Sequence, residues 1–188
     1  AGAFSRPIAI ARRADRMSGP WNTSAMPDEP VIDLHSDDHF MREALRQAAR
    51  AYEADEVPVG AVVVHEGRVI ARDFNRVETL KDATAHAEML SLTAAEAAIG
   101  DWRLTGCTLY STKEPCPMCA GAIVHCRVDR VVFGMSDPKG GAAGGALNLL
   151  HLPTLNHQCE ITSGVREEDC RQLIQQFFRD KRAQPDTP

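Results

Sequence analysis

The spacing of apolar residues divides the chain after residue 36 into a series of short helices and strands. Between residues 37 and 52, apolar side chains recur at steps of three and four, which predicts a helix with one buried face. Ser36 stands where an N-cap would begin this helix. Two β-rich runs, 59–64 and 69–74, flank a short polar segment and predict a hairpin.

The rest of this region alternates strands with helices. We expect a loop at 75–81, strands at about 107–112, 130–133 and 160–162, and helices at about 85–99, 116–125 and 167–181, with a short helix near 146–151. Strands that alternate with helices predict a layered α/β domain with some parallel pairing. Neither an internal repeat nor a second domain is visible in the pattern.

Residues 1–36 carry no periodic pattern and are interrupted by prolines, so we expect a disordered extension or a product of an upstream translation start. An organelle transit peptide is the alternative, because the stretch up to Met26 bears arginines and a single acidic residue. We assign residues 37–182 to one domain and residues 183–188 to a C-terminal tail.

The composition is that of a globular chain. Hydrophobic residues make up 44% and charged residues 25%, and no apolar run approaches the roughly 20 residues of a membrane helix. The net charge of −5 argues against a broad basic surface but leaves room for a local basic patch. Six cysteines could form three disulfides, but their scatter among apolar residues favours free thiols in a reducing, cytoplasmic compartment.

One histidine and two cysteines have a spacing that suits a metal site. His86 lies within Thr84-Ala85-His86-Ala87-Glu88, and Cys116 and Cys119 form a Cys-x-x-Cys pair thirty positions later. A histidine and two thiolates suit zinc and leave a fourth tetrahedral position open to water. Glu88 would reach that water and move its proton.

The cysteine pair alone would also fit a closed structural zinc site or a redox couple. A structural site needs a fourth donor, and Cys107, His125 and Cys126 are near in sequence. The His-x-Glu motif of residues 86–88 favours the open, catalytic arrangement.

Together these motifs resemble those of the zinc-dependent base deaminases, and most closely those of the bacterial tRNA adenosine deaminases (TadA type). The resemblance runs from about residue 37 to residue 182, and it includes Val57-Pro58-Val59-Gly60-Ala61, the two metal motifs and Asp137-Pro138-Lys139. It implies a three-layer cytidine-deaminase-like fold, with a central five-stranded mixed sheet flanked by helices. It also implies hydrolytic deamination of adenosine to inosine at the wobble position of tRNA.

The resemblance assigns roles to individual residues. It implies one Zn²⁺ per subunit held by His86, Cys116 and Cys119, with Glu88 as the proton shuttle, in a homodimer. Asn75 matches the residue that hydrogen-bonds the flipped base, although an isolated asparagine after a strand would more often be a turn residue. The backbones of Val59 and Ala87 would complete the base pocket.

Residues further from the base also match the family. Those that would contact flanking nucleotides are Asp137, Lys139 and Asn156, and those that would help to hold the anticodon stem-loop are Phe177, Phe178 and Arg179. Taken alone, the phenylalanines would be core residues, and Lys139 and Arg179 would be solvated charges. Three positions depart from the family pattern, namely Glu78, Ala83 and Lys113.

Two other functions fit parts of the pattern. The first is a small-molecule deaminase of the guanine or cytosine type on the same fold, which would not need the flanking-nucleotide residues. The second is a non-catalytic RNA-binding module stabilised by zinc, which would not need Glu88. The complete set of motifs favours the tRNA deaminase.

Overall fold

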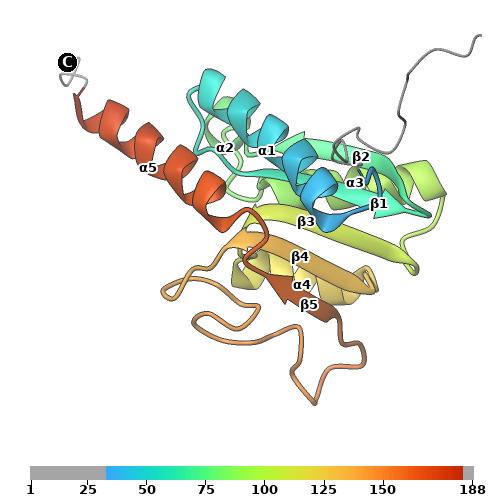
Figure 1. Cartoon of the computed structure of the whole chain (residues 1–188). Helices are drawn as coiled ribbons and strands as arrows, with labels where there is room; N and C mark the ends of the chain where they lie inside the picture. Colours follow the sequence, from blue (N-terminus) through green and yellow to red (C-terminus); the bar gives the residue numbers. More distant parts are fainter. Residues whose placement is uncertain (1–32, 184–188) are drawn as a thin grey trace, which may run out of the picture. The chain divides into compact units, whose positions relative to one another are not determined.

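The computed structural model describes residues 33–183. The predictions for residues 1–32 and 184–188 lie outside the described residues. Within this part of the chain the helices and strands are α1 (Asp37–Glu53), β1 (Gly60–His65), β2 (Arg68–Phe74), α2 (Val77–Leu80), α3 (Ala87–Ile99), β3 (Cys107–Lys113), α4 (Pro117–His125), β4 (Arg130–Met135), β5 (Glu160–Ser163) and α5 (Glu167–Ala183) (Figure 1).

The five strands form one mixed sheet in the order β2-β1-β3-β4-β5. β1 is antiparallel to both β2 and β3, whereas β3, β4 and β5 run parallel to one another. The parallel pairs are joined through α4 and through the long segment between β4 and β5, since parallel neighbours need a crossover connection. The predicted five-stranded mixed sheet is confirmed.

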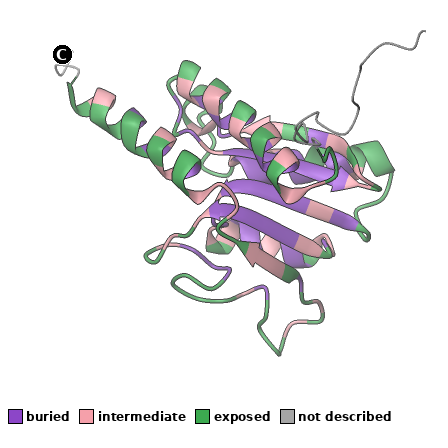
Figure 2. Ribbon diagram, in the orientation of Figure 1, coloured by how far each residue is buried: buried purple, intermediate pink, exposed green. Residues whose placement is uncertain are grey.

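Helices cover both faces of the sheet, as Figure 1 shows: α1 and α5 lie on one face, and α3 and α4 lie on the other. The residues of β1 before His65 are apolar because alternate side chains pack into the two different cores. Ala61 and Val63 pack with the α3 and α4 side, and Val62 and Val64 pack with the α1 and α5 side. Figure 2 accordingly shows burial along the central strands and exposure on the outer sides of the helices. The three-layer architecture follows from these two cores.

The prediction for the first helix is confirmed in detail, because the Ser36 side chain accepts a hydrogen bond from the His39 N–H at 3.2 Å. The predicted short helix near 146–151 is wrong. There the backbone N–H groups of Ala146 and Leu149 bond to the carbonyls of Gly141 and Ala142, so they cannot form i→i−4 bonds. The predicted loop at 75–81 contains one helical turn, α2. Among the helices of residues 33–183, none is long and apolar enough to cross a membrane.

A bidentate ion pair joins the first turn of α1 to the sheet. The Arg130 guanidinium donates to both carboxylate oxygens of Asp37 at 2.8 Å, and also to Thr162 Oγ1 at 2.8 Å. The Tyr110 hydroxyl donates to the same carboxylate at 2.9 Å. The hydrogen bonds from Arg130, together with that from Tyr110, hold the pKa of Asp37 below its ordinary value.

We expect Arg130→Met to lower the free energy of unfolding by about 1–3 kcal/mol at pH 7, because the paired carboxylate loses its partner. A carboxyl whose pKa is lowered by folding stabilises the fold above its unfolded pKa, about 4, and this contribution disappears as the pH falls through the folded pKa. The difference between wild type and variant should therefore shrink below about pH 4. Urea unfolding at pH 7 and pH 3.5 measures both values, and an equal difference at the two pH values would contradict the assignment.

Candidate active site

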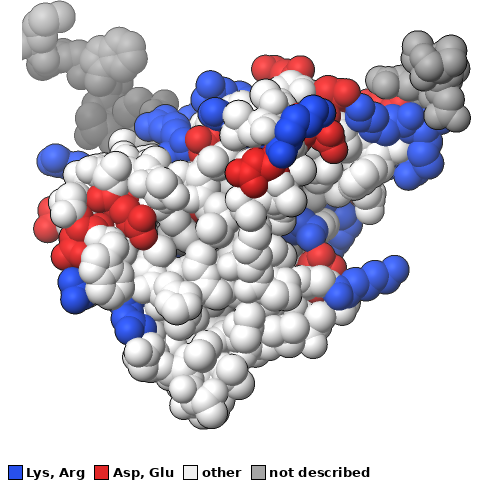
Figure 3. Space-filling model, turned by 180° about the vertical axis from the view of Figure 1, so that it is seen from behind, with Lys and Arg blue, Asp and Glu red and all other residues white. Residues whose placement is uncertain are grey.

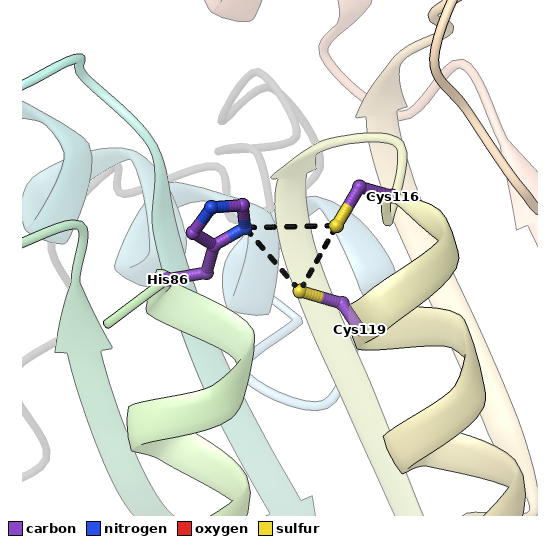
Figure 4. A group of neighbouring side chains, drawn as sticks. All are labelled: His86, Cys116 and Cys119. Atoms are coloured by element: carbon purple, nitrogen blue, oxygen red, sulfur yellow. Dashed lines mark hydrogen bonds between the residues drawn. The ribbon is translucent and has the colours of Figure 1, made fainter. Parts of the chain in front are cut away.

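Three possible metal ligands meet at the ends of two helices. His86 is the N-cap residue of α3, and Cys116 is the N-cap residue of α4, with Cys119 one turn further along. His86 Nδ1 lies 3.6 Å from the sulfur of Cys116 and 3.5 Å from that of Cys119, and the two sulfurs are 3.6 Å apart (Figure 4). Sequence segments thirty residues apart thus present one nitrogen and two sulfurs that could hold a metal ion.

The neighbouring side chains favour the charged form of one sulfur. Hydrogen bonds with Cys119 and then with His86 lower the pKa of Cys116 to about 3. The same pairing with Cys116, reinforced by burial, raises the pKa of Cys119, and the hydrogen bond to Cys116 raises the pKa of His86. These contacts favour a thiolate at Cys116, which is the form of cysteine that binds metals.

Glu88 lies beside this cluster in the first turn of α3 and is only 3% exposed. Burial is the first cause that raises its pKa above the ordinary glutamate value. The hydroxyl of Ser111, in the middle of β3, lies 3.4 Å from Glu88 Oε1 and orients the carboxyl group. Ser111 was not predicted from the sequence, although a serine within the apolar run of a buried strand is a signal for such a contact.

A pocket of about 420 Å³ is lined by Glu88 and by two of the possible metal ligands, His86 and Cys116. This volume lies within the range of small-molecule binding sites. Among the residues predicted from the sequence, its walls include His86, Cys116, Glu88, Asn75, Val59, Ala87 and Phe178. Side chains of α5 close one side of the pocket, so the last helix contributes to it as well as the two motif helices.

The sequence matches the MafB19-like deaminase family over residues 35–182. A protein named tRNA-specific adenosine deaminase from Bacillus subtilis (strain 168) is 53% identical over 149 residues, which cover 79% of this chain and 92% of the relative. A protein of the same name from Agrobacterium fabrum is 48% identical and covers 77% of this chain and 95% of the relative. The chain belongs to the tRNA-specific adenosine deaminase family.

Solved structures agree with this assignment. A structure from work on A-to-I editing by tRNA:A34 deaminases has a TM-score of 0.70 at 47% identity and covers 72% of this chain and 98% of its own. A guanine deaminase from Nitrosomonas europaea reaches a TM-score of 0.67 at 23% identity, covering 94% of this chain and 98% of its own. At that identity the second likeness shows the deaminase fold alone.

Asp137 and Lys139, which are predicted to contact flanking nucleotides, lie in the segment after β4, residues 136–145 of this deaminase. Asp137 is paired with Lys113, the position that departs from the family pattern, and this pairing is the first cause that lowers the Asp137 pKa. The backbone N–H of Lys139 donates to the Asp137 carboxylate at 3.0 Å, whereas the Lys139 side chain is exposed. Neither Asp137 nor Lys139 lines the pocket itself.

The remaining predicted contacts separate into two groups. Phe178 is 42% exposed and lines the pocket, and Arg179 lines an adjoining hollow on α5. Phe177 is buried against Tyr52, with ring centroids 5.7 Å apart, as a core residue would be, and it also lines a second hollow beside Phe178. Asn156 lies outside the pocket, where it accepts a hydrogen bond from Arg127 at 2.6 Å.

A second buried carboxylate, Glu114, fixes the segment that carries Asp137. Glu114 is 2% exposed, and its carboxylate accepts hydrogen bonds from the backbone N–H groups of Asp137 at 2.7 Å, Ala143 at 2.9 Å and Gly145 at 2.7 Å. Because Glu114 is two residues before Cys116, the metal motif and this outer segment of the deaminase share one anchor.

We expect Gly145→Ala to destabilise the protein by about 1–3 kcal/mol, through overpacking around Glu114. A Cβ at this position would lie 2.4 Å from the Asp137 carbonyl oxygen and 2.5 Å from Glu114 Oε2. The matched control is Gly121→Ala within α4, where no atom lies within 4 Å of the added carbon and alanine favours the helix. Thermal unfolding measures both variants, and equal midpoints would contradict the crowding at Gly145.

Proposed function

We propose that this protein hydrolytically deaminates adenosine to inosine at the wobble position of tRNA. The observation that carries the proposal is the buried carboxyl of Glu88 beside a His/Cys/Cys cluster at the base of a pocket of about 420 Å³. A base drawn out of a nucleic-acid strand needs such a recessed pocket to reach a catalytic group. The names of the relatives specify adenosine and tRNA.

We propose Zn²⁺ as the cofactor, with one ion per subunit bound by His86, Cys116 and Cys119. The donor set fits, because one imidazole and two thiolates are borderline-to-soft ligands that suit zinc, and three protein ligands are typical of catalytic sites. The mutual distances of 3.5–3.6 Å between the donor atoms fit a shared ion. When bound, zinc acts as a Lewis acid that activates water near neutral pH.

The protein side chains would carry the proton and orient the base. Glu88 would accept a proton from the attacking water and deliver one to the exocyclic nitrogen at carbon six, which leaves as ammonia. Asn75, which is 7% exposed on the pocket wall, would hydrogen-bond the base edge. The backbones of Val59 and Ala87 would form the remaining contacts, and burial of the pocket would exclude competing water.

The anticodon stem-loop would lie along α5 and the segment after β4. Phe178 lines the pocket and two adjoining hollows, and these hollows also contain the cations Lys81, Arg179, Lys181 and Arg182. An aromatic face among cations suits stacked bases and phosphates. Lys81 and Lys181 are paired with Glu78 and Asp55 in the same hollow, so Arg179 and Arg182 are the cations that support RNA binding by a chain with a net charge of −5. Asp137, Lys139 and Asn156 remain proposed contacts to flanking nucleotides.

We also propose a homodimer in the cytoplasm. Figure 3 shows that the face seen from behind Figure 1, on the α3 and α4 side, is largely uncharged across its centre. Exposed apolar residues near these helices and in the following segments support an interface, namely Ile99, Trp102, Leu147 and Leu152. The six cysteines are free, which suits a reducing compartment. Light scattering on the purified chain tests the dimer.

The deciding experiment compares substrates with the zinc-loaded protein. One reaction contains an anticodon stem-loop with adenosine at the wobble position, and the others contain free adenine, guanine, cytosine and their nucleosides. We expect inosine only in the stem-loop. We also expect kcat/KM to fall steeply as salt rises, because phosphate contacts release counterions.

A different outcome would change the proposal in a defined way. Ammonia released only from a free base, at a rate insensitive to salt, would replace the tRNA substrate by a small molecule and retain the active-site chemistry. No release from any substrate by zinc-loaded protein would favour a non-catalytic RNA-binding module.

A further inference from the structure

A third buried carboxylate, Glu56, lies between α1 and β1 and is not part of the metal cluster. It is 1% exposed and lines the pocket. Its Oε2 accepts hydrogen bonds from Asn75 Nδ2 at 3.2 Å and from the Glu78 N–H at 3.1 Å, and its Oε1 accepts one from the Thr79 N–H at 2.6 Å. All three donors lie within residues 75–79, and Asn75 and Glu78 line a wall of the pocket.

The wall segment, residues 75–81, contains little regular structure of its own. α2 is a single turn, its N-cap residue Arg76 makes no capping hydrogen bond, and it ends at Lys81 in a left-handed conformation with φ of 54°. Short helices of this kind are marginal without tertiary support. The Glu56 carboxylate satisfies two of the N–H groups that the first turn of a helix leaves unpaired.

The same carboxylate also fixes the direction of the Asn75 carboxamide. The Asn75 backbone N–H donates to the Val59 carbonyl at 2.9 Å, which holds the main chain beside β1. That bond leaves the carboxamide free to rotate, and within the described residues the contact that restrains it is the hydrogen bond to Glu56. A side chain that positions the substrate loses much of its catalytic benefit when it is displaced by about 1 Å or rotated by about 20°.

We propose that Glu56 is a positioning residue for catalysis, which holds α2 and the Asn75 carboxamide against the substrate base. The inference rests on the proposed function, because it gives Asn75 the role of base contact. Glu56 acts through Asn75 and does not itself exchange protons with substrate.

The ionisation state of the Glu56 carboxyl group supports this role. Burial would raise its pKa, but the hydrogen bonds from Thr79 and Glu78 outweigh burial and hold the pKa below the ordinary glutamate value. The carboxylate therefore stays ionised at neutral pH and serves as an acceptor for all three donors. Glutamine has the same shape, but its NH₂ group would face an N–H donor and break at least one of the three bonds. Any bond from Asn75 that remains would be to a neutral amide oxygen, which is a weaker acceptor than a carboxylate.

The test is a double-mutant cycle on the holoenzyme with Glu56→Gln, Asn75→Ala and the double variant. With the wobble-adenosine stem-loop, we expect Glu56→Gln to lower kcat/KM by about tenfold in the wild-type background. In the Asn75→Ala background the same change should lower kcat/KM by less than about twofold, because the contact through which it acts is gone. Glu53→Gln is the matched control, since Glu53 is exposed in the same region, and should leave kcat/KM unchanged.

Equal losses in both backgrounds would overturn the proposal, because Glu56 would then act independently of Asn75. If Glu56→Gln fails to fold, Glu56→Asp takes its place in the cycle, since it keeps the charge but shortens the reach. NMR of the Asn75 side-chain NH₂ provides a readout that needs no substrate. We expect its chemical shift and exchange protection to change in Glu56→Gln and not in Glu53→Gln, and an unchanged signal would also overturn the proposal.

These readouts separate the inference from the proposed function. Absence of inosine with wild-type protein would reject the tRNA substrate, whereas the NMR comparison would still decide whether Glu56 holds Asn75.

Discussion

Replacing Glu88 with glutamine is expected to lower kcat by about 10²- to 10⁴-fold, the range that general acid–base catalysis contributes. Glutamine keeps the volume and the contact with Ser111 but cannot accept and return a proton. Because Glu88 is not among the three proposed metal ligands, we expect the variant to retain one zinc ion per chain. Single-turnover rates of inosine formation measure the loss, and RNA binding should remain within about twofold because the outer contacts are unchanged.

Glu96→Gln is a suitable control for Glu88→Gln. Glu96 lies about two turns further along α3, and its carboxylate accepts a hydrogen bond from the Cys126 thiol, which glutamine can also accept. We expect full activity in this variant. A Glu88→Gln enzyme that turns over within tenfold of wild type would assign the proton transfer to another group.

The second large effect is expected for Cys119→Ser. A serine hydroxyl stays protonated near neutral pH and is a poor zinc ligand, whereas cysteine binds as the thiolate. Loss of the metal removes several kcal/mol of transition-state stabilisation, which corresponds to about 10³-fold in rate. We expect protein purified by gel filtration to retain no stoichiometric zinc, and added zinc should fail to restore the activity. Elemental analysis and the deamination assay measure the two effects.

Cys126→Ser provides the matched control for the cysteine substitution. Cys126 is half-buried at the end of α4 and bonds to Glu96 at 2.9 Å, a contact that a serine hydroxyl also makes. This variant should retain one zinc ion and wild-type activity. Loss of zinc from Cys126→Ser would instead indicate a closed structural site with a fourth ligand.

The sequence predicted the layered α/β fold because its signals are local and strong. The alternation of apolar runs with helical periodicity located every strand of the sheet to within a few residues. The His-x-Glu and Cys-x-x-Cys motifs predicted both helix starts at the cluster, because each ligand stands directly before a helical pattern. Pairing order and parallel direction, however, depend on long-range contacts that no local pattern contains.

The anchoring carboxylates could not be predicted from the sequence in the same way. Glu56 and Glu114 stand in polar surroundings where a glutamate is normally solvated, and their burial becomes visible only when distant backbone N–H groups converge on them. The helix expected at 146–151 failed for a related reason. Its N–H groups find partners in residues 141 and 142, a tertiary preference that outweighs helix propensity.

The way in which Glu114 holds the segment after β4 has a consequence for how this enzyme family can diversify. All three of its donors are main-chain N–H groups, which every residue except proline supplies. Exposed side chains of this segment, such as Lys139, can therefore change without altering the path of the chain. The hydrogen bonds to Glu114 thus keep the backbone of this segment in place while substitutions at its exposed positions change the substrate preference.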